Sequence, residues 1–254
     1  MIMRNEYILK LLEKDERLDG RSLAEFRPAK VEQKNIKRAE GSARVTLGKT
    51  DVIAGIKIEL GTPFSDMPDQ GTLKTGAEFA PIAHPDFEPG PPSEEATELA
   101  RVVDRAIRES DCIGLDKLII TPGEKCFEIY VDIHVMNHDG NLIDASSLAA
   151  IAALLNTQIP KLENEKIVRT EFSGKLPVKS KPITVTVGKI IGKLLVDPTK
   201  EEEDMLESKL SVGSVDDGNI SAMQKMGSGR LDEKDIDDMI NIALKKSREL
   251  RKLQ

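Results

Sequence analysis

Apolar and polar residues alternate along much of the chain, and this alternation predicts β-strands. The stretches "AKVEQKNI", "SARVTLG" and "DVIAGIKIEL" are separated by short turns, which indicates an antiparallel meander. Further strands are predicted at "TLKTGAEFAPIA", "KLIITPG" and "KCFEIYVDIHVMN". A different spacing, with apolar residues three and four positions apart, predicts amphipathic helices over 5–15 and 94–110. An alanine-rich helix is predicted over 143–158.

The part of the chain after Pro160 repeats this order of strands followed by a helix. Strands are predicted at "VRTEFS", "PITVTVGKII", "GKLLVD", 208–215 and "NISAMQKMG", and a last helix over 233–251. Helices follow runs of strands and do not alternate with each strand, which favours an α+β fold. We therefore expect an entry segment over 1–20 and two similar halves, 21–160 and 161–254, packed as one unit.

Charge and composition restrict the kinds of partner. The formal net charge of the 254 residues is −7, so nucleic acid would not be held by the overall field of the protein, and any such site must be a local patch. Aromatic residues make up only 3% and Trp is absent, which argues against a platform that stacks successive bases.

Other patterns exclude a membrane span and a metal site. No apolar run approaches the roughly 18 residues that a membrane span needs, and the first residues show no leader pattern, so we expect a cytoplasmic protein without membrane contact. Cys112 and Cys126 show no metal-ligand spacing and are expected to be reduced. His84, His134 and His138 are too scattered for a ligand set, so neither a metal nor a cofactor is expected.

The segment "DGNLIDASSL", residues 139–148, has the pattern of an anion site. It follows a strand, turns at an Asp-Gly pair and opens a helix, so its backbone N–H groups would point toward a bound anion.

Several stretches together resemble the ribonuclease PH family. These are "RLDGR", "FRPAKVE", "AEGSARVTLGKTDVIAGI" and "VDIHVMNHDGNLIDASSLAAIAALLN". The segment "FEPGPPSEEATELARVVDRAIRES" is most similar to the catalytically silent ring subunit of the archaeal exosome. The resemblance implies an RNase PH-like fold of two modules. It also implies a hexameric ring of three heterodimers with a catalytic RNase PH-like subunit, RNA-binding cap proteins and a single-stranded RNA substrate.

The resemblance also allows a test of the chemistry. Active relatives degrade RNA from its 3′ end with phosphate as nucleophile, and carry Gly-Thr-Arg after the Asp-Gly turn. This chain has Asn141-Leu142-Ile143 there, which supplies no hydroxyl and no cation. Asp144 adds a carboxylate to the first helical turn, where it is expected to fill the positive field of the helix. We therefore predict no catalytic residues.

A second comparison concerns the catalytic acid. Active relatives carry a Gly-Glu-Ala-Asp-like segment that aligns with 206–209, and Lys209 stands where they have aspartate. The neighbouring run "KEEEDMLE" is interpreted as a solvated acidic surface. A displaced catalytic carboxylate among Glu201, Glu202, Glu203, Asp204 and Glu207 is the alternative.

The predicted helix over 94–110 carries the candidate RNA contacts. Arg101, Arg105 and Arg108 share one face, opposite an apolar stripe. From the residues alone, a solvated face paired with neighbouring acids is the simpler interpretation. The resemblance favours phosphate contacts, first by Arg101 and Arg105 and then by Arg108.

These observations lead to three hypotheses. The first is a non-catalytic structural and RNA-binding subunit that completes the ring and supports an active partner. The second is a self-sufficient phosphate-dependent 3′-to-5′ exoribonuclease with displaced catalytic residues. The third is an RNA-binding scaffold that acts outside any ring.

Overall fold

A computed structural model describes residues 2–254 of the chain. The helices are α1 (Ile2–Glu13), α2 (Glu94–Arg108), α3 (Leu142–Leu155), α4 (Lys200–Glu203) and α5 (Glu233–Arg251), with a 3-10 turn, η1, at Leu115–Leu118. The strands are β1 (Ala29–Gln33), β2 (Gly41–Leu47), β3 (Thr50–Gly61), β4 (Thr72–Phe79), β5 (Ile119–Thr121), β6 (Lys125–Asn137), β7 (Gln158–Glu163), β8 (Lys166–Lys175), β9 (Ile183–Ile190), β10 (Lys193–Val196), β11 (Ser208–Ser214) and β12 (Ile220–Met226).

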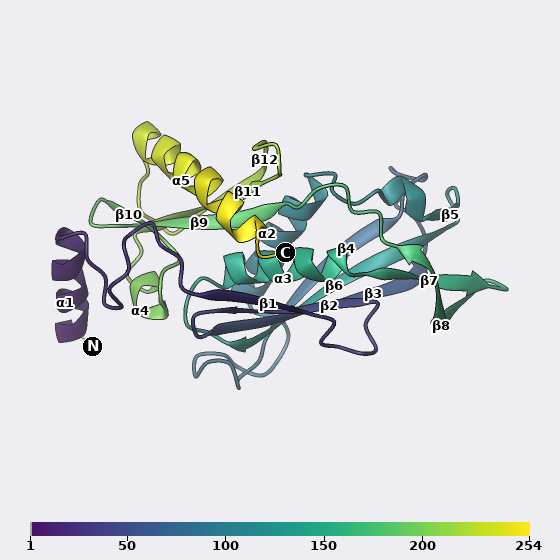
Figure 1. Ribbon diagram of the computed structural model, residues 1–254, viewed down its shortest axis with the longest axis horizontal. Helices are drawn as coiled ribbons and strands as arrows, with labels where there is room; N and C mark the ends of the chain where they lie inside the picture. The colour runs from purple at the N-terminus through teal and green to yellow at the C-terminus, as the bar shows by residue number, and fades with distance from the viewer. Residues whose placement is uncertain (1) are drawn as a thin grey trace.

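The strands form two main sheets. The first has the order β1-β2-β3-β6-β4, with β5 paired to β6, and the second has the order β10-β9-β11-β12. Strands β1, β2 and β3 form the predicted antiparallel meander, while β4 runs parallel to β6. Strands β7 and β8 form a separate hairpin that lies at the end of the molecule opposite α1 (Figure 1). The α+β fold class is confirmed.

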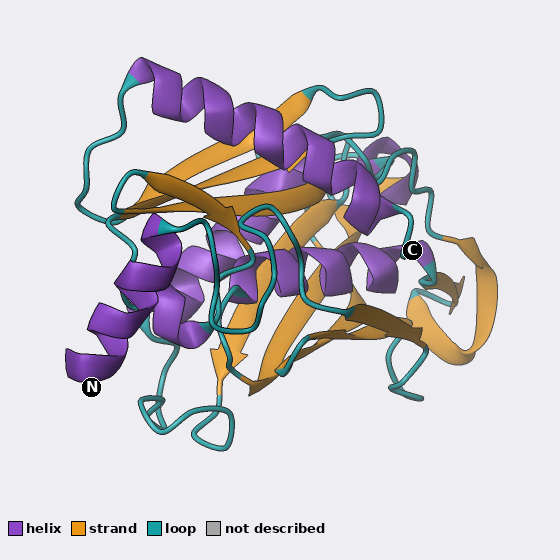
Figure 2. Ribbon diagram, turned by 60° about the vertical axis from the view of Figure 1, so that its left-hand side comes forward, coloured by secondary structure: helices purple, strands orange, loops and turns teal. Residues whose placement is uncertain are grey.

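Helices α2 and α3 lie between the two sheets (Figure 1). Helix α3 packs on β2 and β3 of the first sheet and on β9 of the second, and α2 packs on β4 and β12. Because α3 is covered from both sides, every residue from Leu142 to Leu154 is buried, as expected of a helix that is apolar all round. Helix α5 covers the outer face of the second sheet (Figures 1 and 2).

Local chemistry explains where the helices begin. Ser93 caps α2, and its Oγ accepts a hydrogen bond from the N–H of Ala96 at 3.2 Å. Asp232 and Asp235 form a reciprocal capping box at the start of α5. Both starts agree with the prediction from the sequence.

Four predicted elements differ from the structure. Helix α1 begins and ends earlier than predicted, and its buried apolar residues are Ile8 and Leu12, while Tyr7 is exposed. Helix α3 ends at Leu155 because the side chains of Asn156 and Thr157 bind its last carbonyls. In the stretch "KLIITPG" only Ile119–Thr121 form a strand, β5, directly after the last two residues of η1, and "TLKTGAEFAPIA" is a strand only as far as Phe79. Strand β7 and the short helix α4 were not predicted.

Candidate functional site

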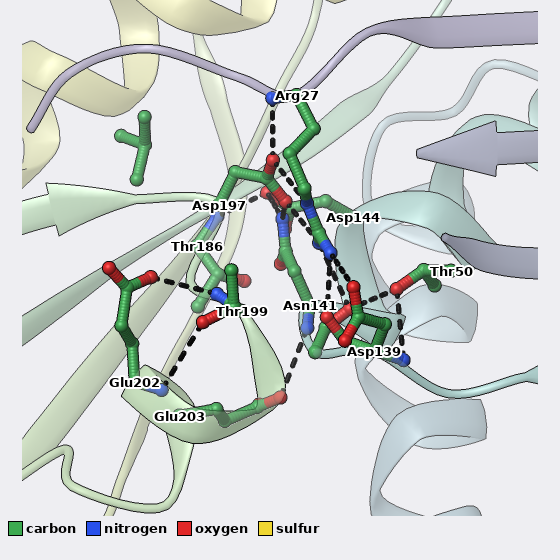
Figure 3. Close-up of polar contacts among 12 residues, drawn as sticks. Arg27, Thr50, Asp139, Asn141, Asp144, Thr186, Asp197, Thr199, Glu202 and Glu203 are labelled. Atoms are coloured by element: carbon green, nitrogen blue, oxygen red, sulfur yellow. Dashed lines mark hydrogen bonds and ion pairs between the residues drawn. The ribbon is translucent and has the colours of Figure 1, made fainter. Parts of the chain in front are cut away.

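The start of α3 meets a carboxylate from the second half of the chain. Asn141 precedes the helix in a left-handed conformation, with φ of 55°, and its side chain caps no helix N–H. Its backbone N–H instead donates to Oε2 of Glu203 at 3.0 Å (Figure 3). Oε1 of Glu203 lies 2.6 Å from Nζ of Lys209. The anion at this helix terminus is therefore Glu203, and the prediction that Asp144 fills this position is wrong.

The environment of Glu203 keeps it ionised. Burial by itself would raise the pKa of this carboxyl group, but the ammonium of Lys209 and the N–H of Asn141 outweigh burial and lower the pKa below its ordinary value. Glu203 is thus a negative charge at neutral pH, placed where the partial positive charge of α3 is greatest.

Asp144 connects α3 to the second sheet. It lies in the first turn as predicted, is fully buried, and its Oδ2 accepts hydrogen bonds from Nδ2 of Asn141 and from the N–H of Thr186, both at 3.1 Å. Burial raises the pKa of Asp144 to about 7, and the charge of Asp197 adds to the shift. Asp144 therefore has a structural role, but it is a link between α3 and β9 and not an anion for the helix terminus.

Arg27 and Asp197 hold the turn before α3 in place. Arg27 donates to Asp197 from Nε at 2.9 Å and from Nη2 at 2.7 Å, and its Nη1 reaches the carbonyl oxygen of Asp139 at 2.6 Å. Asp197 also accepts a hydrogen bond from Nδ2 of Asn141 at 3.0 Å (Figure 3). The stretches "FRPAKVE" and "DGNLIDASSL", far apart in sequence, are joined here.

The acidic run around α4 is a solvated surface only in part, because Glu202 and Glu203 are mostly buried while Asp204 and Glu207 are exposed, and this corrects the interpretation from sequence. Glu202 is buried and pairs with Arg17, with 2.5 Å between Oε2 and Nη2, and it also closes a capping box with Thr199. The other acids have partners too. Glu201 pairs with Arg4, Glu203 with Lys209, and Asp204 with Lys200, while Glu207 accepts the N–H of Ile191. Arg4 and Arg17 are far from their partners in sequence, so these two pairings cannot be read from local composition.

A cleft of about 1190 Å³ opens beside Glu203 and Lys209. Eight carboxylates line it: Glu78, Asp86, Glu88, Glu94, Glu95, Glu98, Glu203 and Asp204. The two lysines in the lining, Lys200 and Lys209, are both engaged by carboxylates. Leu142 and Ile143 face this cleft with apolar side chains. The cleft therefore has an excess of negative charge.

Two histidines, predicted to be scattered, meet in the wall of this cleft. The rings of His84 and His138 lie 5.2 Å apart, and Phe87 stacks on His138 at 5.5 Å. Burial lowers the pKa of His138 to about 4, so it is neutral at physiological pH. His134 is exposed on β6 beside Glu78. Among residues 2–254, no group of three or more His, Cys, Asp or Glu side chains is arranged to hold a metal ion.

The arginines of α2 divide into two kinds. Arg108 donates to Asp104 at 3.0 Å and to the carbonyl oxygen of Leu73 at 2.8 Å. Arg101 and Arg105 are exposed and pair with none of the side chains that the structure describes. Both line a cavity of about 660 Å³ between α2 and the second sheet, together with Thr184, Ser211 and Met223. Arg108 is thus already engaged by partners within the chain, whereas Arg101 and Arg105 are not engaged by described side chains.

The fold and the sequence define the class of protein. The model of domain 1 of the 3′ exoribonuclease family matches residues 25–160, and the model of domain 2 matches residues 181–246. The chain belongs to this family, known as the RNase PH family.

Similar proteins within this family are named as one component of the exosome complex. The chain is 49% identical over 251 residues to the exosome complex component Rrp42 of Methanosarcina acetivorans, covering 99% of this chain and 93% of the relative. The Rrp42 component of Pyrococcus furiosus is 46% identical over 256 residues, covering 99% and 92%. None of the helices in the described part of the chain is long and apolar enough to cross a membrane.

Chains of solved archaeal exosome structures are also similar to this chain. A chain of the Archaeoglobus fulgidus exosome with RNA bound to the active site superposes with a TM-score of 0.92 and 45% identity, covering 98% of this chain and 97% of that chain. A chain of an archaeal exosome core gives a TM-score of 0.88 at 42% identity, covering 98% and 95%.

Proposed function

We propose that this chain is a non-catalytic, RNA-binding subunit of an archaeal exosome ring in the cytoplasm, where it supports an active partner in 3′-to-5′ phosphorolysis of RNA. The family match and the named Rrp42 relatives support the exosome assignment. The observation that carries the non-catalytic role is the contact of Glu203 with Asn141 and Lys209.

This contact matters because phosphorolysis needs a bound phosphate dianion. The reaction is catalysed by holding that dianion in line with the last phosphodiester and balancing its charge with cations. Here the N–H at the start of α3 and the nearby ammonium are both taken by Glu203. Ile143 stands where active relatives place an arginine. An excess of carboxylates in the cleft opposes the entry of both phosphate and RNA.

RNA binding is proposed at the neighbouring cavity between α2 and the second sheet, which shares Glu94, Glu95 and Glu98 with the cleft but also contains the guanidinium groups of Arg101 and Arg105. Arg101 and Arg105 can reach a phosphate without breaking an existing ion pair, whereas Arg108 would have to leave Asp104. The hydroxyl of Thr184 lines the same cavity, is buried, and has no hydrogen-bond partner among the described residues. Two guanidinium groups and a hydroxyl suit a phosphodiester group, and such contacts are independent of base sequence.

The proposed assembly contains three copies of this chain and three of a catalytic RNase PH-like subunit, with RNA-binding cap proteins on the ring. Its support is the identity to the Rrp42 components and the overlap with chains of archaeal exosome structures. Native mass measurement tests it: this chain mixed with the catalytic subunit is expected to give a complex with equal numbers of the two.

The catalytic proposal is tested with purified proteins and a single-stranded RNA in phosphate buffer. The isolated chain is expected to release no nucleoside diphosphates, and the reconstituted pair is expected to release them. Release by the isolated chain that is lost on Asp204→Asn would instead support the self-sufficient exoribonuclease. RNA binding without any assembly would support the scaffold hypothesis.

A further inference from the structure

Small and polar side chains line the face of the second sheet that lies beneath α2. In the register of β9, β11 and β12, Gly213 lies between Thr184 and Ala222. In the next row of the same face, Ser211 lies opposite Gln224. A hydrophobic core would have large apolar side chains at these positions. The short side chains instead leave the cavity of about 660 Å³ between the sheet and α2.

The cavity has one cationic wall and one neutral wall. The wall on α2 carries the guanidinium groups of Arg101 and Arg105, which pair with none of the described side chains. The wall on the sheet carries the hydroxyl groups of Thr184 and Ser211 and the amide of Gln224. A bound phosphate is therefore expected on the α2 side, because it needs cations. The sheet side suits a neutral group that forms hydrogen bonds.

The hydroxyl group of Thr184 lacks a partner. Thr184 is 1% exposed, and its Oγ1 has no hydrogen-bond partner among residues 2–254. The hydroxyl of Ser211, on the same wall, shares a hydrogen bond of 2.7 Å with Thr186. A buried hydroxyl without a partner costs free energy, and native proteins leave few of them unpaired. A ligand in the cavity can supply the missing partner.

The ligand group that best fits Thr184 is another hydroxyl. A ribose 2′-hydroxyl donates and accepts hydrogen bonds, as the side chain of Thr184 does. A stacked base has no platform here, because none of the described residues that line the cavity is aromatic. The volume lies within the range of about 300–1,000 Å³ of sites that take whole small molecules, so a sugar can enter beside its phosphate.

We propose that Thr184 reads the sugar: its hydroxyl group binds the ribose 2′-hydroxyl next to the phosphate held by Arg101 and Arg105, so that this chain favours RNA over DNA. The inference rests on the proposed function, because it places this contact in the same RNA-binding cavity. It adds a selectivity that phosphate contacts cannot supply, since RNA and DNA have the same phosphodiester groups and differ at the 2′-hydroxyl.

The test compares rings reconstituted with the wild-type chain and with Thr184→Val, which keeps the shape of the side chain and removes the hydroxyl. Affinities for a labelled single-stranded RNA and for DNA of the same sequence are measured by fluorescence anisotropy in phosphate-free buffer, which prevents phosphorolysis. Thr184→Val is expected to weaken RNA binding about three- to tenfold, the value of one neutral hydrogen bond, and to leave DNA binding unchanged. Thr184→Ser keeps the hydroxyl and is expected to keep the preference for RNA.

A second measurement locates the contact on the RNA. Single-stranded RNAs that each carry one 2′-deoxynucleotide, at successive positions, are bound to both rings. The catalytic subunit is the same in both rings, so losses caused by its own sugar contacts are expected in both. For at least one position, the loss is expected in the wild-type ring and absent in the Thr184→Val ring. If every position behaves alike in the two rings, the proposal is wrong.

Thr72→Val is the matched control. Thr72 is also a buried threonine, with 2% exposed, but it lies on β4 of the first sheet and lines neither the cavity nor the cleft. Both affinities are expected to stay at the wild-type values. An equal loss of RNA affinity in this control would assign the effect of Thr184→Val to a loss of stability, and would overturn the proposal.

The ratio of RNA to DNA affinity decides the remaining outcomes. A Thr184→Val ring that binds both as the wild type does, or that weakens equally for both, would overturn the proposal. If Thr184→Val rings do not assemble, Thr184→Ala takes their place with the same expected results, because it also removes the hydroxyl.

The two proposals fail in different ways. Unchanged RNA affinity in Arg101→Glu/Arg105→Glu would contradict the proposed RNA-binding cavity. A loss of affinity in that variant, together with an unchanged preference for RNA in Thr184→Val, would contradict only the sugar contact.

Discussion

The guanidinium of Arg27 and the carboxylate of Asp197 form a buried two-point pair, with Nε and Nη2 at 2.9 and 2.7 Å from the two oxygens. Arg27 precedes the first sheet and Asp197 follows β10 of the second. The pair therefore joins the two sheets at the turn that opens α3.

Arg27→Ala is expected to destabilise the fold by about 3–5 kcal/mol, because it leaves the buried Asp197 carboxylate without its main counter-charge. Arg44→Ala is the control. Arg44 also forms a two-point pair, with Asp51, but its side chain is 42% exposed, so the expected cost is about 1 kcal/mol or less. Urea unfolding measures the loss of unfolding free energy in each variant. Equal losses would mean that burial does not make the Arg27–Asp197 pair more stabilising than the exposed Arg44–Asp51 pair.

Gly140→Ala should be more harmful than the same change at another left-handed glycine. A Cβ at Gly140 would lie 2.3 Å from the carbonyl oxygen of Pro198, whereas a Cβ at Gly123 would meet nothing within 4 Å. Both positions have positive φ, 88° and 74°, so the conformational cost of about 1 kcal/mol is shared. We expect Gly140→Ala to cost at least about 2 kcal/mol more in unfolding free energy. Similar losses of unfolding free energy in the two variants would indicate that the backbone around Pro198 can move to accommodate the added Cβ at little cost.

Asp144→Asn should change how stability depends on pH. The pKa of Asp144 is raised from 3.8 to about 7, so the folded state holds its proton while the unfolded state loses it. The contribution of this group to stability therefore falls as pH rises from about 4 to 7 and is constant above that.

The amide introduced by Asp144→Asn stays neutral, and its oxygen can still accept hydrogen bonds from Asn141 and Thr186. The variant is expected to be more stable than the wild type at pH 8 by about 2–4 kcal/mol, and to differ little at pH 4. Thermal unfolding across this range measures the difference. A difference independent of pH would show that Asp144 is ionised in both states.

Arg101→Glu/Arg105→Glu should weaken RNA binding by the assembled ring. Each reversal replaces a phosphate contact by repulsion, so we expect a loss of about tenfold or more at low salt and a shallower dependence on salt concentration. The measurement is fluorescence anisotropy with a labelled single-stranded RNA.

Lys245→Glu/Arg248→Glu makes the same charge change on α5, on the other face of the second sheet, and is expected to leave affinity nearly unchanged. Native mass measurement must show that both double variants still assemble into intact rings. Equal affinities of the two double variants would assign Arg101 and Arg105 to an ordinary solvated surface.

Local pattern was sufficient for most of the fold. Alternation predicted the meander of β1 to β3 and the long strand β6, and the predicted starts of α2 at 94 and of α5 at 233 agree with the structure. These features depend on neighbours within a few residues, so the sequence contains them directly. Strand β7 was missed because Pro160 interrupts its pattern, and it pairs with β8 only through register shifts on both sides of that proline.

The sequence by itself determined that the start of α3 lacks the donors of a phosphate site, because Leu142 and Ile143 carry none. Only the tertiary structure decided what takes their place. Glu203 reaches Asn141 across 62 residues, and Arg17 reaches Glu202 across 185. An acidic run looks the same whether it faces water or a buried cation, since local composition does not encode distance in space. The packing of the two sheets around α3 brings these charged groups together. Glu203 then accepts the N–H of Asn141 and pairs with Lys209.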